Sequence, residues 1–312
     1  MKKVLLTLLI ASSSIVVFAQ QDPQFSQNMF NKLQPNPATA GSNDAICASL
    51  LYRSQWVSFD GAPKTMLLSV DAPVDVLHGG LGLTVMSDKL GFEKSLVAKL
   101  AYALRFSVGS GNLALGVDGG IIQKSLEGGI ITPGQSGGVY NPKDIDDPLI
   151  PLASVSGTEF DLSAGAYYNS EHFYAGVSAT NLTQPKIDFG SSIYKEVTHL
   201  YGTIGASFDL TPSIALKPSV FVKSIPAKTI ADINLNAHFS DRFWIGASYR
   251  LEDAIVAMVG VNIIENLRLG YSYDITTSPI KNYNNGSHEI TLGYCYKIKK
   301  KIPPVIRNVR FL

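Results

Sequence analysis

The residues that could carry chemistry in this chain are its five histidines, its two cysteines and several glycine clusters. The histidines do not have the spacing of metal ligands, and His288-Glu289 lacks the second histidine of a zinc-binding helix. Gly79-Gly80-Leu81-Gly82 lies in a strand-like pattern and not before a helix, so a phosphate-binding loop is not indicated. No Ser/His/Asp set for nucleophilic catalysis stands out. We therefore expect no catalytic residue, no metal and no cofactor, and predict that the protein is not an enzyme.

The first 19 residues have the features of a secretory signal peptide. Lys2 and Lys3 form a charged start, apolar residues follow at 4–10 and 15–18, and Val17-Phe18-Ala19 forms a cleavage site with a small final residue. A first transmembrane helix is the alternative, but the segment is short and no stop-transfer charges follow it. We expect cleavage after Ala19 and export. Because no cysteine stands at that point, a lipoprotein anchor is not indicated.

Composition narrows the class of exported protein. The formal net charge is only +1, which argues against binding to nucleic acid or to a membrane surface by charge. Charged residues make up 16% of the chain, below the roughly 25% of typical soluble domains. After the signal peptide, no apolar stretch reaches the length of about 18 residues that a spanning helix needs.

The last third of the chain alternates between apolar and polar residues with period two. The apolar residues of its first segment fall at every second position, namely Phe243, Ile245, Ala247, Tyr249 and Leu251. Further segments with the same alternation cover 255–263, 267–275 and 290–298. Strands of this kind form a sheet with one apolar and one polar face. With the apolar face outside, the sheet is a membrane-spanning β-barrel.

Alternation upstream gives ten more candidate strands, and the total of fourteen is even, as in bacterial outer-membrane barrels. These ten cover 46–59, 65–74, 79–88, 94–107, 111–124, 158–169, 171–181, 197–210, 213–224 and 228–239. Connections after even-numbered strands should be short periplasmic turns, and the connection at Asn169-Ser170 is short. The two longest connections, 125–157 and 182–196, follow odd-numbered strands. The sequence thus predicts an all-β, antiparallel up-and-down transmembrane barrel.

The same alternation places polar side chains on the inner face of the barrel. They could be solvated or paired with one another, or they could form a surface that recognises a partner. We single out seven residues as a candidate lumenal or partner-binding surface, namely Arg53, Gln55, Trp56, Arg105, Arg250, Asp274 and Glu289.

The two cysteines fall at the ends of the predicted barrel. Cys47 lies at the start of the first strand and Cys295 near the end of the last, which become neighbours when the barrel closes. Both would face inward near the periplasmic rim, where a disulfide could form in an oxidising compartment if the register opposes them. Two separate small residues are the alternative.

Segments outside the sheet complete the domain plan: a signal peptide at 1–19, an N-terminal segment at 20–45, the barrel at 46–298 and a tail at 299–312. The N-terminal segment could plug the lumen or hang in the periplasm. Pro303-Pro304 within the tail prevents the last strand from continuing. Its basic residues form a candidate periplasmic docking strip, consisting of Lys299, Lys300, Lys301, Arg307 and Arg310.

Several motifs resemble the PorP/SprF family, barrel proteins of the type IX secretion system and gliding machinery of Bacteroidota. The resemblance starts at Gln21-Asp22-Pro23-Gln24-Phe25-Ser26-Gln27 and continues through Asn36-Pro37-Ala38, Tyr52-Arg53 and Gln55-Trp56. Later matches are Tyr249-Arg250, Tyr271-Ser272-Tyr273-Asp274 and Gly286-Ser287-His288-Glu289-Ile290. The resemblance implies an outer-membrane component of a protein-export machine. Its partners would be periplasmic ring proteins and their lipoproteins, or a secreted surface adhesin.

Three functions compete at this stage. The leading one is a non-enzymatic secretion or gliding component, embedded in outer-membrane lipid, that binds other proteins and no nucleic acid. The second is a passive porin or a channel for hydrophobic solutes. The third, a soluble extracellular β-sandwich, would have to bury the apolar face that a barrel turns to lipid.

Overall fold

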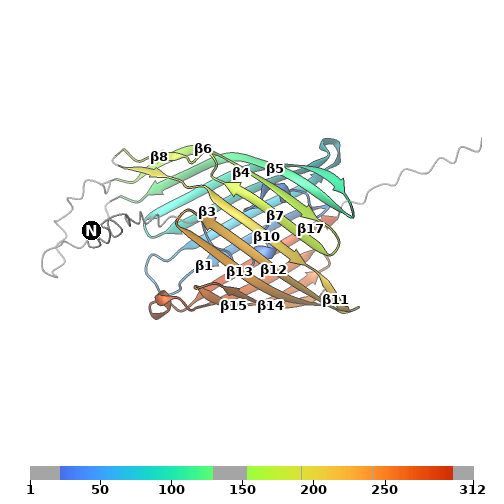
Figure 1. Ribbon diagram of the computed structural model, residues 1–312. Helices are drawn as coiled ribbons and strands as arrows, with labels where there is room; N and C mark the ends of the chain where they lie inside the picture. The colour runs from blue at the N-terminus through green and yellow to red at the C-terminus, as the bar shows by residue number, and fades with distance from the viewer. Residues whose placement is uncertain (1–21, 129–152, 191, 241, 298–312) are drawn as a thin grey trace, which may run out of the picture.

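The computed structural model describes residues 22–128, 153–190, 192–240 and 242–297. Antiparallel strands close into a single barrel, in which the first strand pairs with the last and β10 also pairs with β12 (Figure 1). The barrel strands are β1 (Ala45–Ser54), β2 (Lys64–Val74), β3 (Gly79–Leu90), β4 (Glu93–Val108), β5 (Gly111–Leu126), β6 (Val155–Asn169), β7 (Phe173–Thr180), β10 (His199–Ala206), β11 (Phe208–Thr211), β12 (Ile214–Ile225), β13 (Lys228–Phe239), β14 (Phe243–Arg250), β15 (Ala254–Ile264), β16 (Leu267–Thr276) and β17 (Ser287–Lys297).

Since β10 and β11 occupy one position in the barrel, with Ser207 between them, the barrel has fourteen strand positions. The predicted fourteen-stranded antiparallel barrel is confirmed. The break within the eighth predicted strand was not expected. A register shift between β11 and β12 at Asp209 and Thr211 accompanies it.

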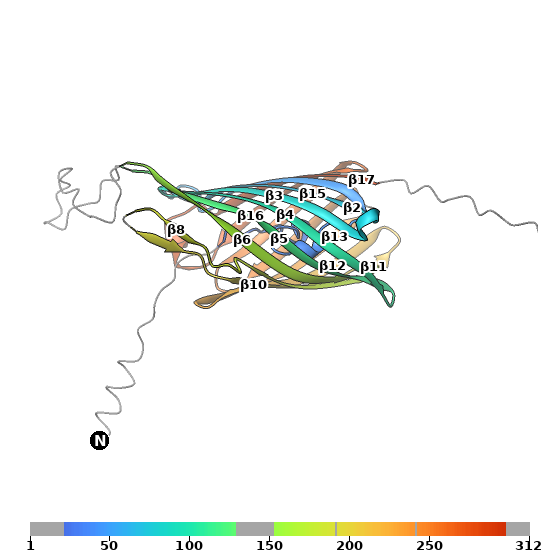
Figure 2. The ribbon, with the colours of Figure 1, turned by 90° about the horizontal axis from the view of Figure 1, so that it is seen from above.

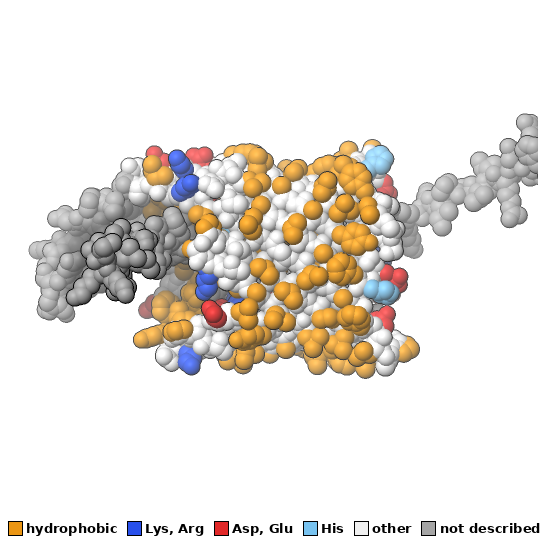
Figure 3. All heavy atoms as spheres, viewed as in Figure 1, with side chains coloured by type: hydrophobic (Ala, Val, Ile, Leu, Met, Phe, Trp, Pro, Cys, Tyr) orange, Lys and Arg blue, Asp and Glu red, His pale blue; other side chains and the backbone are white. Residues whose placement is uncertain are grey.

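The period-two alternation becomes an outer and an inner face. In β15, Ile255, Val259 and Val261 are exposed on the outside, while Val256 and Met258 are buried. Figure 3 shows apolar side chains over the barrel wall, with charged side chains gathered at its two ends. This distribution matches a barrel wall in contact with lipid hydrocarbon. Within the described residues, no helix is long and apolar enough to cross a membrane.

The two ends of the barrel differ in the length of their connections. One end, which we call the mouth, carries the connections 55–63, 127–154, 181–198 and 277–286. The opposite end, which we call the base, carries the short turns 109–110, 170–172 and 212–213, and β17 ends there (Figure 1). The connection between β2 and β3 at the base holds the 3-10 helix η3 (Asp75–Leu77), and η4 (Pro279–Asn282) lies at the mouth.

The sequence analysis did not predict a small hairpin at the mouth. Strands β8 (Lys186–Asp188) and β9 (Ile193–Lys195) form it within the connection between β7 and β10. Ile187 and Phe189 of this hairpin pack on Ile122 of the barrel wall. The hairpin is therefore anchored to the inner side of the wall by apolar contacts.

The first strand is shorter than predicted. It ends at Ser54 and not at residue 59, because the backbone turns away immediately afterwards. Trp56 and Ser58 have φ angles of 50° and 73°, in the left-handed region that strands do not use. Gln55 and Trp56 consequently belong to the mouth connection and not to the wall.

Residues 22–44, which we call the lumenal segment, lie inside the barrel between its walls (Figure 2). Asp22 lines a cavity at the mouth, while Ser42 and Asn43 line a cavity at the base, so the segment runs from one end to the other. It contains two short 3-10 helices, η1 (Asn28–Phe30) and η2 (Pro37–Thr39).

Glycines in the wall allow this segment to approach closely. A Cβ atom at Gly80 would lie 2.2 Å from the carbonyl oxygen of Ala40, and one at Gly116 would lie 2.4 Å from the Cα atom of Ala38. Any side chain at these two positions would displace the segment. Gly80 of the glycine cluster is thus a position where the backbone of the lumenal segment packs directly against the barrel wall.

Candidate functional site: the barrel lumen

Five charged side chains from five strands meet inside the barrel and form what we call the lumenal charge cluster. They are Arg53, Asp232, Arg250, Asp274 and Glu289, and each is at most 2% exposed. Arg53 lies 2.7 Å from Asp274 and 3.1 Å from Glu289. Arg250 lies 3.0 Å from Asp232 and 3.0 Å from Asp274. Asp274 therefore bridges the two arginines.

Strand register explains why these residues meet. Arg53 of β1 is directly opposite Glu289 of β17, and Asp232 of β13 is directly opposite Arg250 of β14. Directly opposed residues point to the same face of a sheet, with their Cβ atoms close together. The alternation that turns apolar residues to lipid thus turns these charges toward one another in the lumen.

The cluster contains three carboxylates and two guanidinium groups, and the lumenal segment supplies the missing donors. The backbone N–H groups of Ser26 and Gln27 donate to the two oxygens of Glu289, each at 2.8 Å. The side-chain amide groups of Gln24 and Asn28 donate to Asp232 at 3.2 and 3.1 Å. Since buried carboxylates are costly without partners, these donors stabilise the wall as well as the segment.

A second contact holds the segment on the other side of the lumen. Asn36 accepts a hydrogen bond from the backbone N–H of Ala38 at 3.0 Å and donates to the carbonyl oxygen of Ala166 in β6 at 3.1 Å. The Ser178 hydroxyl of β7 donates to the carbonyl oxygen of Pro35 at 2.6 Å. The segment is therefore bound to both halves of the barrel.

A third contact holds the mouth end of the segment at Asp22. Its carboxylate accepts a hydrogen bond from the Tyr201 hydroxyl at 2.7 Å, and its carbonyl oxygen accepts one from Lys223 at 2.8 Å. Burial alone would raise the pKa of the Asp22 carboxyl. The nearby His199, the Tyr201 hydroxyl and Lys223 outweigh burial and hold this pKa below its usual value.

Two cavities flank the lumenal segment. The mouth cavity holds about 550 Å³ and is lined by Gln55 and Trp56 among others. Lys124 in its wall pairs with Glu93 at 2.6 Å and with Glu196 at 3.2 Å. Burial raises the pKa of Glu196, which lies in the connection before β10, to about 7. The base cavity holds about 410 Å³ and lies on the other side of the segment.

The structure brings together four of the seven residues singled out from the sequence, namely Arg53, Arg250, Asp274 and Glu289. Gln55 accepts a hydrogen bond from Arg53 at 3.3 Å at the edge of this cluster, and Trp56 lies at the mouth, where its backbone N–H donates to the Ser287 hydroxyl. Arg105 lies apart, at the base, where it pairs with Asp44 at 2.9 Å. The tail residues Lys299, Lys300, Lys301, Arg307 and Arg310 lie outside the described residues.

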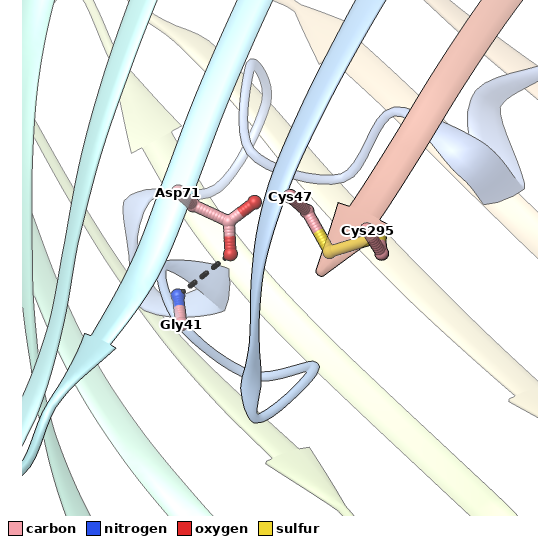
Figure 4. The surroundings of a disulfide bond; sticks show 4 residues. All are labelled: Gly41, Cys47, Asp71 and Cys295. Carbon is pink, nitrogen blue, oxygen red and sulfur yellow. Dashed lines mark hydrogen bonds between the residues drawn. A yellow bond between two sulfur atoms is a disulfide. The ribbon is translucent and has the colours of Figure 1, made fainter. Parts of the chain in front are cut away.

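Cys47 and Cys295 lie directly opposite each other in β1 and β17, at the base end of both strands. Their side chains are joined as a disulfide across the seam between the first and last strands, with the Cα atoms 4.1 Å apart (Figure 4). The covalent link encloses nearly the whole barrel, because the two residues are separated by 248 positions.

Sequence reasoning did not single out Asp232 or Ser26 as members of this site. Asp232 is on the inner face by alternation, and its place opposite Arg250 required the register of β13 and β14. Ser26 lies in an irregular segment, where periodicity gives no direction for a side chain. Its occurrence within the Gln24-Phe25-Ser26-Gln27 motif was the one available signal.

The closed barrel, its apolar outer wall and its polar interior define an integral outer-membrane β-barrel protein. The family described as "Type IX secretion system membrane protein PorP/SprF" matches residues 17–294. The chain belongs to this family. Its membership extends over the lumenal segment as well as over the barrel strands.

Solved structures that resemble this chain include a hydrocarbon channel, a toluene transporter and an outer-membrane protein, all of low sequence identity. CymD, a monoaromatic hydrocarbon channel, is 10% identical, with 88% of this chain and 93% of that chain covered and a TM-score of 0.50. The Pseudomonas putida toluene transporter TodX is 9% identical, with 89% and 95% covered and a TM-score of 0.45. Acinetobacter baumannii Omp33 is 9% identical, with 81% and 99% covered and a TM-score of 0.44. The likeness to CymD concerns the fold alone. No curated protein matches the sequence.

Proposed function

We propose that this protein is a closed, non-enzymatic barrel that binds other proteins of the type IX secretion and gliding machinery. Its partners are periplasmic ring proteins with their lipoproteins, or a secreted surface adhesin. Family membership supports a role in type IX secretion. The lumenal segment supports a barrel that does not conduct, because it is bound at Asp22, at Ser26 and at Asn36 to different parts of the wall.

The observation that carries this proposal is the mutual dependence of the lumenal charge cluster and the segment. Glu289 is 0% exposed with the segment in place, and without Ser26 and Gln27 it would lose two backbone donors. Displacing the segment would remove these donors, at a cost of about 1–3 kcal/mol for each charged group that water does not then reach. A passive channel would gain nothing from such an arrangement.

Bilayer recording tests the closed state. Purified full-length protein in planar bilayers should show no large, reproducible open-channel currents, whereas a bacterial porin inserted under the same conditions should show them. Such currents from this protein would contradict a closed barrel and favour the alternative, a porin or hydrophobic-solute channel.

Protein capture tests the partners. Affinity purification of the barrel from solubilised outer membranes should recover periplasmic ring proteins or a secreted adhesin. Deleting residues 301–312, which lie outside the described residues, should leave the barrel inserted and reduce that recovery. A truncated protein that fails to insert would identify the tail as an assembly signal, and docking by the tail would then be wrong.

A further inference from the structure

Three cationic side chains line the base cavity, namely Lys32, Lys217 and Arg268. They come from the lumenal segment, from β12 and from β16, so the fold brings them together from distant parts of the chain. None of the three forms an ion pair with a carboxylate among the residues that the structure describes. They contrast with the lumenal charge cluster, in which each arginine contacts two carboxylates within 3.1 Å.

Arg268 is held in place by an aromatic ring. The central carbon of its guanidinium group lies 4.3 Å from the centre of the Phe30 ring. A guanidinium group that contacts a ring through its face keeps its N–H edges available for hydrogen bonds. No hydrogen bond from these edges to another described residue is present. The geometry leaves a fixed fork of donors, the arrangement that recognises an oxyanion in bidentate fashion.

Lys32 is held in a similar way. Its ammonium group lies 3.6 Å from the centre of the Tyr174 ring and donates a hydrogen bond to the Tyr167 hydroxyl at 3.1 Å. Burial, and then repulsion from Lys217 and Arg268, lower the pKa of Lys32 to about 8. Such repulsion requires the three cations to be near one another. An anion bound among them would relieve it.

The acidic residues of the same cavity do not neutralise this group. Asp71 accepts a hydrogen bond from the backbone N–H of Gly41 at 2.9 Å (Figure 4). Glu171 lies in the short turn between β6 and β7. Within the described part of the chain, neither forms an ion pair with Lys32, Lys217 or Arg268. His172 and His238 complete the titratable lining of the cavity.

We propose that the base cavity is an anion-binding site that takes a carboxylate-rich segment of a protein partner. Its volume of about 410 Å³ is within the range of ligand pockets, about 300–1,000 Å³. The turn residues Ser170 and His172 line it, so it opens at the base, from which a protein segment can enter. Lipid cannot reach it through the wall, because the paired strands close the barrel.

This inference rests on the proposed function in one respect, namely that the barrel binds other proteins. The predicted basic tail would leave the barrel at the same end, since β17 ends there. A partner that contacts both surfaces must therefore be acidic, which makes carboxylates of Asp and Glu side chains the expected anions.

Fluorescence anisotropy with a fluorescein-labelled oligoglutamate peptide tests the site on full-length protein in detergent micelles. The wild-type protein should bind the peptide saturably. Arg268→Gln should weaken binding by about tenfold or more, because a hydrogen bond to a charged group contributes about 1.5–3 kcal/mol. Lys217→Gln, which keeps the fork of Arg268, should weaken binding by less.

Arg242→Gln is the matched control, since Arg242 is an exposed arginine after β13 at the base and does not line the cavity. It should bind the peptide as the wild type does. Heat-dependent mobility in gels should first establish that each variant is a folded barrel. Equal affinity of Arg268→Gln and wild type would overturn the proposal, and so would inorganic phosphate that binds as tightly as the peptide. Anisotropy reports this site independently of bilayer currents, so either proposal can fail alone.

Discussion

Ser26 and Asp274 are 248 positions apart, yet the Ser26 hydroxyl lies 2.6 and 2.8 Å from the two oxygens of the Asp274 carboxylate. The same hydroxyl oxygen accepts hydrogen bonds from Arg53 at 2.9 Å and from Arg250 at 3.2 Å. One small side chain of the lumenal segment therefore contacts both arginines and the carboxylate that bridges them. The segment and the wall form one continuous polar core.

Replacing Ser26 with alanine should destabilise the barrel. The change removes a donor to Asp274 and an acceptor for Arg53 and Arg250, none of which can reach water. We expect the free energy of unfolding to fall by about 2–3 kcal/mol, measured by urea unfolding in lipid vesicles. Ser107→Ala, at an exposed serine near the base, is the matched control and should change stability by less than about 0.5 kcal/mol. Equal effects of the two substitutions would show that the cluster does not depend on Ser26.

Much of the barrel could be predicted from the sequence, because every strand of the wall has one face toward lipid and one toward a polar interior. Apolar and polar residues must therefore alternate with period two. Lipid outside and polar groups inside make alternation continuous, and β13 was predicted with the bounds that the structure has, Lys228–Phe239. Prediction failed where this period ends. The strand boundary after Ser54 depends on the left-handed backbone at Trp56, and the hairpin of β8 and β9 has strands of three residues, too short for a period.

The candidate site could be predicted only in part, for a related reason. Alternation placed Arg53, Arg250, Asp274 and Glu289 on the inner face, but their contacts depend on strand register. The cations of the base cavity show the same limit. Lys32 belongs to a segment without regular structure, so its position beside Tyr174 and Arg268 follows only from the fold.

Protease added to intact cells should cleave within the connection 127–154 and spare the turn 170–172. The reason is that long connections of outer-membrane barrels face outside and short turns face the periplasm. Fragment masses after brief digestion would locate the cuts, and cells with a permeabilised outer membrane provide the comparison. Cleavage in the turn 170–172 in intact cells, with 127–154 protected, would contradict this orientation.

The Cys47–Cys295 pair should be oxidised in protein isolated from the outer membrane. Thiol labelling of denatured, unreduced protein should then modify no cysteine, and prior reduction should expose two free thiols per chain. In a chain-entropy view, closing a loop of this length stabilises the folded state by about 5–6 kcal/mol. Cys47→Ser should lower the free energy of unfolding accordingly, and Ser49→Ala, on the same strand, serves as the control. Two labelled thiols without reduction would rule out the bond.

Binding of the oligoglutamate peptide at the base should depend on pH through Lys32. This residue lies in the lumenal segment, outside the spanning strands, and faces Tyr167, Tyr174, Lys217 and Arg268. Since its pKa is about 8, Lys32 is cationic at about pH 7 and neutral at about pH 9.5, whereas arginine and glutamate keep their charges. Affinity should therefore fall by about three- to tenfold over this range at constant ionic strength. Lys32→Gln should bind weakly at both pH values and lose the dependence. A variant that keeps the full pH profile would show that Lys32 does not contact the bound anion.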